Sequence, residues 1–160
     1  MHLSDRGRML LGSLEGAKTA AYKDSAGLPT IGVGHLLTRD ELSSGKLYIA
    51  GQPVKWSQGL TSAQVAALLA QDVVPVEQAV TALVRVPTSQ NQFDALVLFA
   101  FNVGREAFAK STLLRQINQQ EFARVPAELR RWVHAGGQRI AGLANRREAE
   151  VKLWQEGKQA

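Results

Sequence analysis

Two carboxylates and one hydroxyl lie close together near the N-terminus of the chain: Glu15, Asp24 and Thr30. Glu15 directly precedes Gly16, and glycine often ends a helix because it can take the left-handed conformation. Leu11 lies one helical turn earlier, so we expect Glu15 at the edge of an apolar stripe. Partial desolvation there favours the protonated carboxyl, which is the form that a general acid needs.

Asp24 and Thr30 are predicted to lie on the two strands of a short hairpin. The connecting loop has three residues and ends in Gly27, which can supply the left-handed conformation that such a loop needs. In this register Asp24 is opposite Leu28, and Tyr22 is opposite Thr30. Opposed residues share a face, and so do residues two apart. The three-residue loop therefore places the carboxylate and the hydroxyl on one face, whereas a two-residue loop would separate them.

Each of these residues also has an ordinary structural explanation. An aspartate that opens a turn usually accepts hydrogen bonds from the turn backbone, and a glutamate before a helix-ending glycine is usually solvated. A longer motif favours a catalytic role: Glu15, eight residues, Asp24, five residues and Thr30, followed directly by IGVGHLLT at 31–38. Together with FNVG at 101–104 and the later GLANRR segment, this motif resembles the phage-type lysozymes, the endolysins of glycoside hydrolase family 24.

The resemblance implies an N-acetylmuramidase that hydrolyses the β-1,4 bond between N-acetylmuramic acid and N-acetylglucosamine in bacterial peptidoglycan, for phage-induced lysis of the host. In that role Glu15 protonates the leaving glycosidic oxygen, and Asp24, with Thr30, positions and activates the attacking water. Since a hydroxyl that holds a water is needless when a carboxylate attacks the sugar directly, we expect inversion at the anomeric carbon. Three further residues match positions that border the substrate cleft in the family: Leu36, Phe101 and Asn102.

The resemblance also implies a structural ion pair between His35 and Asp72. His35 follows the catalytic hairpin, and Asp72 lies in the long helix predicted downstream. A carboxylate beside the imidazole would raise the pKa of the histidine. The alternative is that both side chains are separately solvated.

The expected fold is α+β and lysozyme-like. It is a single catalytic domain with a small hairpin lobe at about 16–60, a connecting helix at about 61–84, and a helical lobe at about 85–160 that is joined by the N-terminal helix. Pro75 is expected to kink the connecting helix or to start a second segment. The polar, turn-rich stretch 40–59 can hold one more short hairpin.

One helix of the larger lobe is predicted to be central and buried. It opens after the capping segment 87–89, is apolar nearly all round, and ends at Gly104. Asn102 is a polar side chain at the end of this apolar helix. A buried polar group must have a hydrogen-bond partner, so Asn102 is expected to meet either a protein group or a ligand.

The charge of the chain leaves a binding function open. Lys and Arg outnumber Asp and Glu by 19 to 14, which gives a formal net charge of +5 and would attract any polyanion. The alternative function is a non-catalytic wall- or nucleic-acid-binding module, whose phosphate-contacting surface would be made by Arg124, Arg130, Arg131, Arg139, Arg146 and Arg147. Aromatic residues between these arginines are few, so we expect no nucleic-acid partner.

No cofactor or metal ion is expected. The 160 residues include no cysteine, and His2, His35 and His134 are too scattered to suggest metal ligands. The longest apolar run near the N-terminus is 9–11, so we expect no signal-peptide core and no stable membrane insertion. The resemblance then implies a monomer that is made in the host cytoplasm, depends on a holin for release, and acts on the peptidoglycan of the periplasm or cell wall.

A lytic transglycosylase is the rival enzyme. It cleaves the same bond and leaves an anhydro sugar, so it needs one acid but no activated water. Asp24 and Thr30 would then have no catalytic task, and we therefore rank this reaction second.

Overall fold

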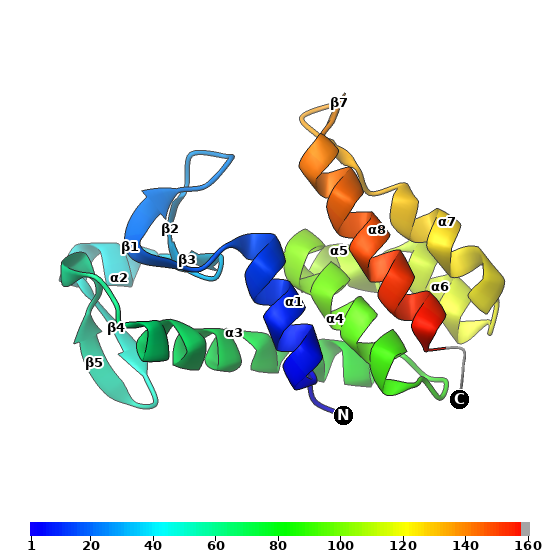
Figure 1. Cartoon of the computed structure of the whole chain (residues 1–160), viewed down its shortest axis with the longest axis horizontal. Coiled ribbons are helices and arrows are strands. Elements are labelled where there is room, and N and C mark those ends of the chain that lie inside the picture. Colours follow the sequence, from blue (N-terminus) through cyan, green and yellow to red (C-terminus); the bar gives the residue numbers. More distant parts are fainter. Residues whose placement is uncertain (158–160) are drawn as a thin grey trace. The chain divides into compact units, whose positions relative to one another are not determined.

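The computed structural model describes residues 1–157 and combines helices with small antiparallel sheets (Figure 1), which confirms the predicted α+β class. The chain forms two compact units. The small unit is Met9–Val74, and the helical unit combines Met1–Arg8 with the chain from Pro75 onward. The divisions fall inside two helices, α1 (Asp5–Glu15) and α3 (Ser62–Leu83). Each unit is described by itself below.

A three-stranded sheet forms one part of the small unit, with the strand order β1-β2-β3. Its strands are β1 (Lys18–Lys23), β2 (Pro29–Gly32) and β3 (His35–Leu36). Tyr22 pairs with Thr30 across the first two strands, and Thr30 pairs with Leu36 across the next two. Gly27 has a φ of 78° at the end of the hairpin loop. The predicted three-residue loop and its register are therefore confirmed.

The stretch after this sheet is more regular than the predicted polar segment. It contains α2 (Arg39–Ser44), β4 (Lys46–Ile49), β5 (Gln52–Lys55) and the 3-10 turn η1 (Trp56–Gln58). The expected hairpin is confirmed by the pairing of β4 with β5. The helix α2 was not predicted, because it buries no residue and so has no apolar period. Its signal was instead a capping box, in which Thr38 and Glu41 bond each other's backbone N–H groups.

The long helix α3 begins at a second capping box, between Thr61 and Gln64. Pro75 lies inside the helix, which continues through it, so the second segment considered from the sequence does not occur. Val65, Leu68 and Leu69 are buried, as the helical spacing predicted. An interior proline removes one backbone hydrogen bond and its ring crowds the carbonyl four residues earlier, so Pro75 weakens α3 without ending it.

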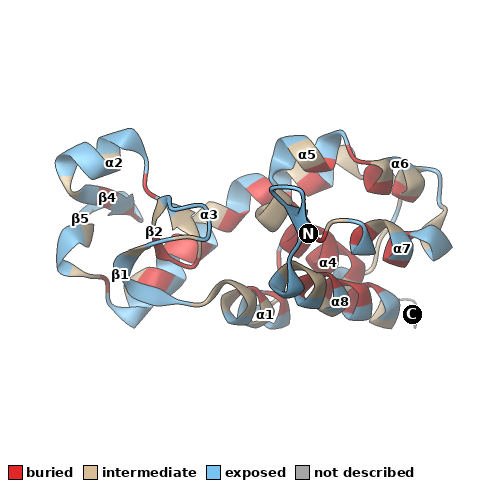
Figure 2. Ribbon diagram, turned by 90° about the horizontal axis from the view of Figure 1, so that it is seen from above, coloured by how far each residue is buried: buried red, intermediate tan, exposed pale blue. Residues whose placement is uncertain are grey.

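The central helix of the helical unit is α4 (Gln90–Val103), which Figure 2 shows largely in red. A third capping box, between Ser89 and Gln92, starts it, and every residue of 92–100 is buried. It packs against α8 (Ala141–Glu156), whose Trp154 is fully buried. The remaining elements of this unit are α5 (Arg105–Ala109), α6 (Thr112–Asn118), η2 (Phe122–Arg124), α7 (Val125–Arg130), β6 (His134–Ala135) and β7 (Gln138–Arg139).

The start of α1 is attached to the helical unit by polar contacts. The Ser4 hydroxyl accepts a hydrogen bond from the Gly7 N–H at 3.0 Å and donates to the Asp94 carboxylate. Asp94 is fully buried and also accepts from the Ser4 backbone N–H and from the Gln90 amide. Gly7 is buried against Asp94, and a Cβ at this position would lie 2.6 Å from Leu3 Cδ1 and 3.0 Å from Asp94 Cγ.

The two glycines in α1 are therefore predicted to respond oppositely to alanine. Gly12→Ala should raise the free energy of unfolding by about 0.5–1 kcal/mol, because alanine favours the helix and nothing lies within 4 Å of the new Cβ. Gly7→Ala should lower it by about 1–3 kcal/mol, because the added methyl overpacks a buried site. Urea unfolding of both variants measures this difference, and equal stabilisation by the two would contradict the packing at Gly7.

Candidate active site

Asp24 is held at the mouth of the catalytic hairpin by the loop that it opens. Its Oδ1 accepts hydrogen bonds from the backbone N–H groups of Ala26 and Leu28, both at 2.9 Å. The Asp24 N–H in turn donates to the Leu28 carbonyl at 2.9 Å. The turn-forming role considered from the sequence is therefore real. Both of these bonds go to Oδ1, and no bond is found for Oδ2 among the described residues.

Thr30 lies on the same face of the sheet as Asp24, at the position directly opposite Tyr22. It is only 1% exposed. Its hydroxyl donates to the Leu28 carbonyl at 2.9 Å, so its one proton is engaged. A hydroxyl retains two acceptor lone pairs when it donates. The Thr30 oxygen can therefore still accept a hydrogen bond from another group.

Glu15 is the last residue of α1, as predicted. Gly16 follows with a φ of 74°, and its N–H donates to the Gly12 carbonyl at 2.9 Å. The left-handed glycine ends the helix and turns the chain toward β1. The Glu15 side chain is half-buried, which agrees with its expected place at the edge of an apolar stripe.

Tyr22 was not predicted as a site residue, although the structure places it beside both carboxylates. Burial, and then the negative charges of Glu15 and Asp24, raise the pKa of this phenol above its ordinary value of 10.0. Two carboxylates act on one side chain, so the end of α1 and the mouth of the hairpin meet at Tyr22. The signal available in the sequence was its position two residues before Asp24 and opposite Thr30.

Leu36 extends this face with an apolar surface. It lies opposite Thr30 on β3 and is 50% exposed, although it is a large hydrophobic residue. Tyr22, Thr30 and Leu36 thus form one row across the three strands. Leu36 is thus an exposed apolar side chain directly opposite the buried Thr30 hydroxyl.

The other two predicted substrate-binding residues belong to the helical unit. Phe101 and Asn102 are half-buried at the end of α4. The Oδ1 atom of Asn102 accepts a hydrogen bond from Arg147 Nη2 at 2.5 Å. Arg147 is fully buried, and its guanidinium carbon lies 5.0 Å from the centre of the Phe99 ring. Asn102 has therefore found a protein partner, which fixes the direction of its amide group.

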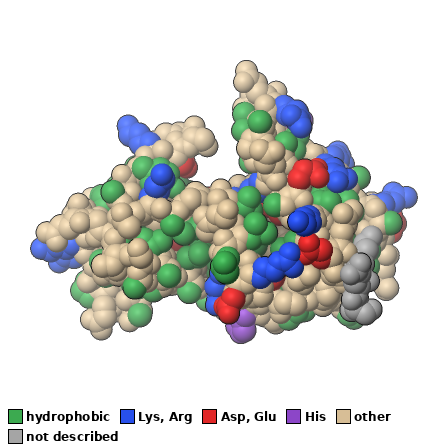
Figure 3. Space-filling view, in the orientation of Figure 1, with side chains coloured by type: hydrophobic (Ala, Val, Ile, Leu, Met, Phe, Trp, Pro, Cys, Tyr) green, Lys and Arg blue, Asp and Glu red, His purple; other side chains and the backbone are tan. Residues whose placement is uncertain are grey.

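The six arginines do not form the phosphate-contacting surface considered from the sequence. Arg146 and Arg147 are buried and lie 3.5 Å and 3.0 Å from the Glu150 carboxylate. On the surface, Figure 3 shows acidic side chains beside basic ones over the helical unit. Three of the arginines pair with glutamates, at 2.7 Å, 2.7 Å and 3.2 Å: Arg124 with Glu121, Arg130 with Glu148 and Arg131 with Glu128. The prediction of a surface made by all six arginines was therefore wrong for Arg146 and Arg147, which are buried.

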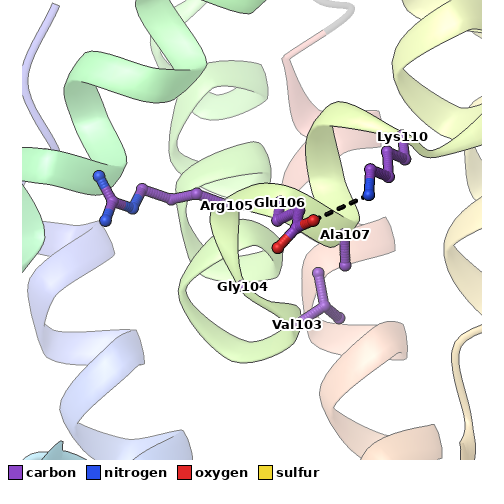
Figure 4. Close-up of a pocket in the computed structure, with 6 residues that line it drawn as sticks. All are labelled: Val103, Gly104, Arg105, Glu106, Ala107 and Lys110. Atoms are coloured by element: carbon purple, nitrogen blue, oxygen red, sulfur yellow. Dashed lines mark hydrogen bonds and ion pairs between the residues drawn. The ribbon is translucent and has the colours of Figure 1, made fainter.

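A surface hollow lies directly after Asn102 in the chain, around the start of α5 (Figure 4). It is lined by Val103, Gly104, Arg105, Glu106, Ala107 and Lys110. Glu106 is paired with Lys110 at 2.8 Å, and the Arg105 side chain points away from that pair. The hollow contains none of the predicted catalytic residues, so it is not the candidate active site.

His35 lies between two carboxylates rather than one. Its Nδ1 is 2.7 Å from Asp72 Oδ2, and its Nε2 is 2.9 Å from Glu41 Oε1. Burial opposes protonation, but the hydrogen bonds and charges of Asp72 and then Glu41 outweigh it and raise the pKa of His35 from 6.5 to about 9. Glu41 was not predicted as a partner of His35. Because Glu41 also accepts a hydrogen bond from the Thr38 N–H at the cap of α2, and Asp72 lies on α3, His35 connects β3 to both helices.

Two general features of the structure bear on its function. In the described part of the chain, no group of three or more His, Cys, Asp or Glu side chains is arranged to hold a metal ion. No helix among residues 1–157 has the length and apolar character needed to cross a membrane.

Comparison with known proteins relates the chain to one family. The family model for phage lysozyme matches residues 12–150. The endolysin of Salmonella phage P22 is 40% identical over 136 residues, which cover 85% of this chain and 86% of that protein. The SAR-endolysin of Escherichia phage Mu is 37% identical over 147 residues, which cover 92% of this chain and 77% of that protein.

Solved structures agree with this relation. The muramidase domain of SpmX from Asticaccaulis excentricus has a TM-score of 0.78 at 33% identity, and covers 96% of this chain and 98% of its own. A crystal structure of a P22 lysozyme mutant has a TM-score of 0.79 at 37% identity, and covers 97% of this chain and 99% of its own.

The His35 site predicts a loss of stability at alkaline pH. A histidine whose pKa is raised by folding stabilises the protein fully below its unfolded value of 6.5, and this contribution is lost as pH rises through about 9. The free energy of unfolding should therefore fall by on the order of 2 kcal/mol between these values. Urea unfolding at several pH values measures the slope.

His35→Gln should remove most of this slope. His134→Gln is the matched control, because His134 is exposed on the short strand β6. A slope that survives in His35→Gln, or that disappears in the control, would contradict the assignment.

Proposed function

Because the chain belongs to the phage lysozyme family, it is a peptidoglycan-degrading muramidase that serves host lysis, and we propose that Glu15, Asp24 and Thr30 carry out its reaction. One observation carries the proposal. The hairpin register sets Asp24 and Thr30 on one face, and the charges of Glu15 and Asp24 both act on Tyr22 of that same face. The bond cleaved is the β-1,4 bond between N-acetylmuramic acid and N-acetylglucosamine.

Glu15 is the proton donor in this mechanism. It protonates the glycosidic oxygen as the bond to the anomeric carbon breaks, so the leaving sugar departs as a neutral alcohol. Its position at the end of α1, beside Tyr22 and facing the same side chain as Asp24, supports this role. Tyr22 lies beside both carboxylates and stays neutral near pH 7, where its phenol can donate a hydrogen bond.

Asp24 and Thr30 hold the attacking water. The hydroxyl proton of Thr30 is directed to the Leu28 carbonyl, so Thr30 can only accept from the water. Asp24 Oδ1 is held by two N–H groups, and Oδ2 can accept the other proton of the water. With both protons engaged, a lone pair of the water is directed at the anomeric carbon. Asp24 takes the proton as the new bond forms.

The substrate is proposed to be bound partly by apolar contact. Leu36 offers an exposed surface next to Thr30. Phe101 and Asn102 are the proposed contacts from the helical unit, where Arg147 orients the Asn102 amide. No role in the reaction is assigned to a cofactor.

A lytic transglycosylase would cleave the same bond by attack of the substrate's own hydroxyl. The arrangement of Asp24 and Thr30 favours hydrolysis, since a threonine that can only accept is suited to a water. Mass analysis of digested peptidoglycan separates the two reactions: hydrolysis leaves reducing ends, whereas a transglycosylase leaves anhydro sugars.

Release to the wall is part of the proposal. Peptidoglycan lies outside the cytoplasmic membrane, whereas phage proteins are synthesised inside the host. We propose that the enzyme is made in the cytoplasm as a monomer and reaches the wall through a holin-type membrane lesion. Rapid lysis on expression of this chain without membrane damage would contradict that route.

Replacing the proton donor should abolish activity without unfolding the protein. Glu15→Gln keeps the size and shape of the side chain but removes the acidic proton, so the rate of peptidoglycan clearance should fall by about 100-fold or more. Glu106→Gln makes the same chemical change at an exposed residue and should leave the rate unchanged. A Glu15→Gln variant with near wild-type clearance would exclude Glu15 as the acid.

The stereochemistry of the product tests the roles of Asp24 and Thr30. A β-linked oligosaccharide should first yield the α-anomer, which proton NMR detects before mutarotation, because a water attacks from the opposite face. Thr30→Val should lose most activity while costing about 1 kcal/mol of stability, since it removes one hydrogen bond but keeps the branched shape. An initial β-anomer would show retention and overturn both roles.

A further inference from the structure

The outward face of the β4–β5 hairpin carries an unusual set of side chains, which we call the hairpin platform: Lys46, Tyr48, Pro53 and Lys55. Lys46 lies directly opposite Lys55, and Tyr48 lies directly opposite Pro53. The alternate residues Leu47 and Ile49 are buried. The four platform residues therefore share the solvent face of the hairpin.

This arrangement is unfavourable for the folded protein alone. Like charges directly opposed across a strand pair repel each other, and neither lysine has an ion-pair partner among the described residues. Tyr48, on the same face, is 63% exposed, so its aromatic ring is open to solvent. A pair of unneutralised ammonium groups next to an open aromatic ring is suited to a ligand that carries negative charge and an apolar face.

The backbone of the platform is attached to α3. The side-chain amide of Gln71, on α3, donates to the Tyr48 carbonyl at 3.0 Å and accepts from the Ala50 N–H at 3.4 Å. Buried Leu47 anchors the inner face of the same strand. The backbone that presents the four side chains is therefore in place before a ligand binds.

The platform is separate from the proposed catalytic residues within the small unit. β4 and β5 form a sheet of their own, whereas Asp24 and Thr30 belong to the sheet of β1, β2 and β3. Figure 1 places the hairpin near the start of α3, away from the β1–β2 loop. A ligand on the platform would thus be additional to the sugar whose bond is cleaved.

We propose that the hairpin platform is a second binding site for peptidoglycan. It binds a part of the glycan strand whose stem peptide carries carboxylates, away from the bond that is cleaved. The inference rests on the proposed function, since the substrate of a muramidase is a long polymer with carboxylates along its length. The two ammonium groups bind a carboxylate of the stem peptide, and the Tyr48 ring with Pro53 packs against a sugar or peptide face. The site keeps the enzyme on the polymer between cleavage events.

The test measures binding to intact sacculi without hydrolysis. Lys46→Gln with Lys55→Gln is introduced into the full chain that also carries Glu15→Gln, and the dissociation constant is measured by sedimentation with purified sacculi. Affinity should weaken by about three- to tenfold, as expected for the loss of two exposed charge contacts. The matched control is Lys110→Gln with Lys152→Gln, which removes the same charge from the exposed surface of the helical unit and should bind as the parent does.

Three more measurements make the test specific. Tyr48→Ser should also weaken binding, and amidation of the sacculus carboxyls should weaken the parent to the level of the double lysine variant. In chains with Glu15 intact, the double lysine variant should hydrolyse a soluble chito-oligosaccharide, which has no carboxylates, at the parent rate. Its thermal midpoint should equal or exceed that of the parent, because the opposed charges are gone.

Equal sacculus binding by the double lysine variant and its control would overturn the proposal, and so would indifference to amidation. Loss of binding to phosphatidylglycerol vesicles with unchanged binding to sacculi would assign the platform to a membrane surface instead. If the parent enzyme does not hydrolyse the oligosaccharide, the proposed function is wrong. Sacculus binding is measured independently of that result.

Discussion

The register of the β1–β2 hairpin is the constraint on which the proposed chemistry depends. Two backbone N–H groups of the loop bind one oxygen of Asp24, and this interaction fixes the loop at three residues. A shift of one residue in a strand pair would turn every side chain to the other face. Asp24 and Thr30 would then lie on opposite faces of the hairpin. The residue proposed as the base is thus also the residue that sets the register for its partner.

Much of the local structure could be predicted from the sequence because its causes are local. Capping residues and helix-ending glycines act over four or five positions, and they predicted the end of α1, the start of α3 and both ends of α4. The three-residue loop predicted the face that Asp24 and Thr30 share. The short helix α2 was missed because it has a cap but no apolar period. Tyr22 was missed because its importance comes from an approach of Glu15 that the chain order does not reveal.

The arginines show why charge was the harder property to predict. A run of basic residues near the C-terminus is usually a solvated surface, yet Arg146 and Arg147 are buried. Burial of a guanidinium is tolerated only when carboxylates, carbonyls and aromatic faces replace its water. Glu150, the Leu98 carbonyl and the Phe99 ring supply these contacts from two helices. His35 follows the same rule in the small unit, where Asp72 and Glu41 make its charged form the stable one.

The direction of two hydrogen bonds separates the possible mechanisms more clearly than the identity of the residues does. Asp24 binds two N–H donors through Oδ1, which leaves Oδ2 as the oxygen that can meet a reactant. Thr30 gives its proton to the Leu28 carbonyl, so it cannot stabilise an attacking carboxylate by donation. It can only accept, and a water is the reactant with protons to offer. A Thr30 hydroxyl that donated its proton toward the reactants would suit a covalent intermediate; bonded to the Leu28 carbonyl as it is, Thr30 favours the proposed water held between two acceptors.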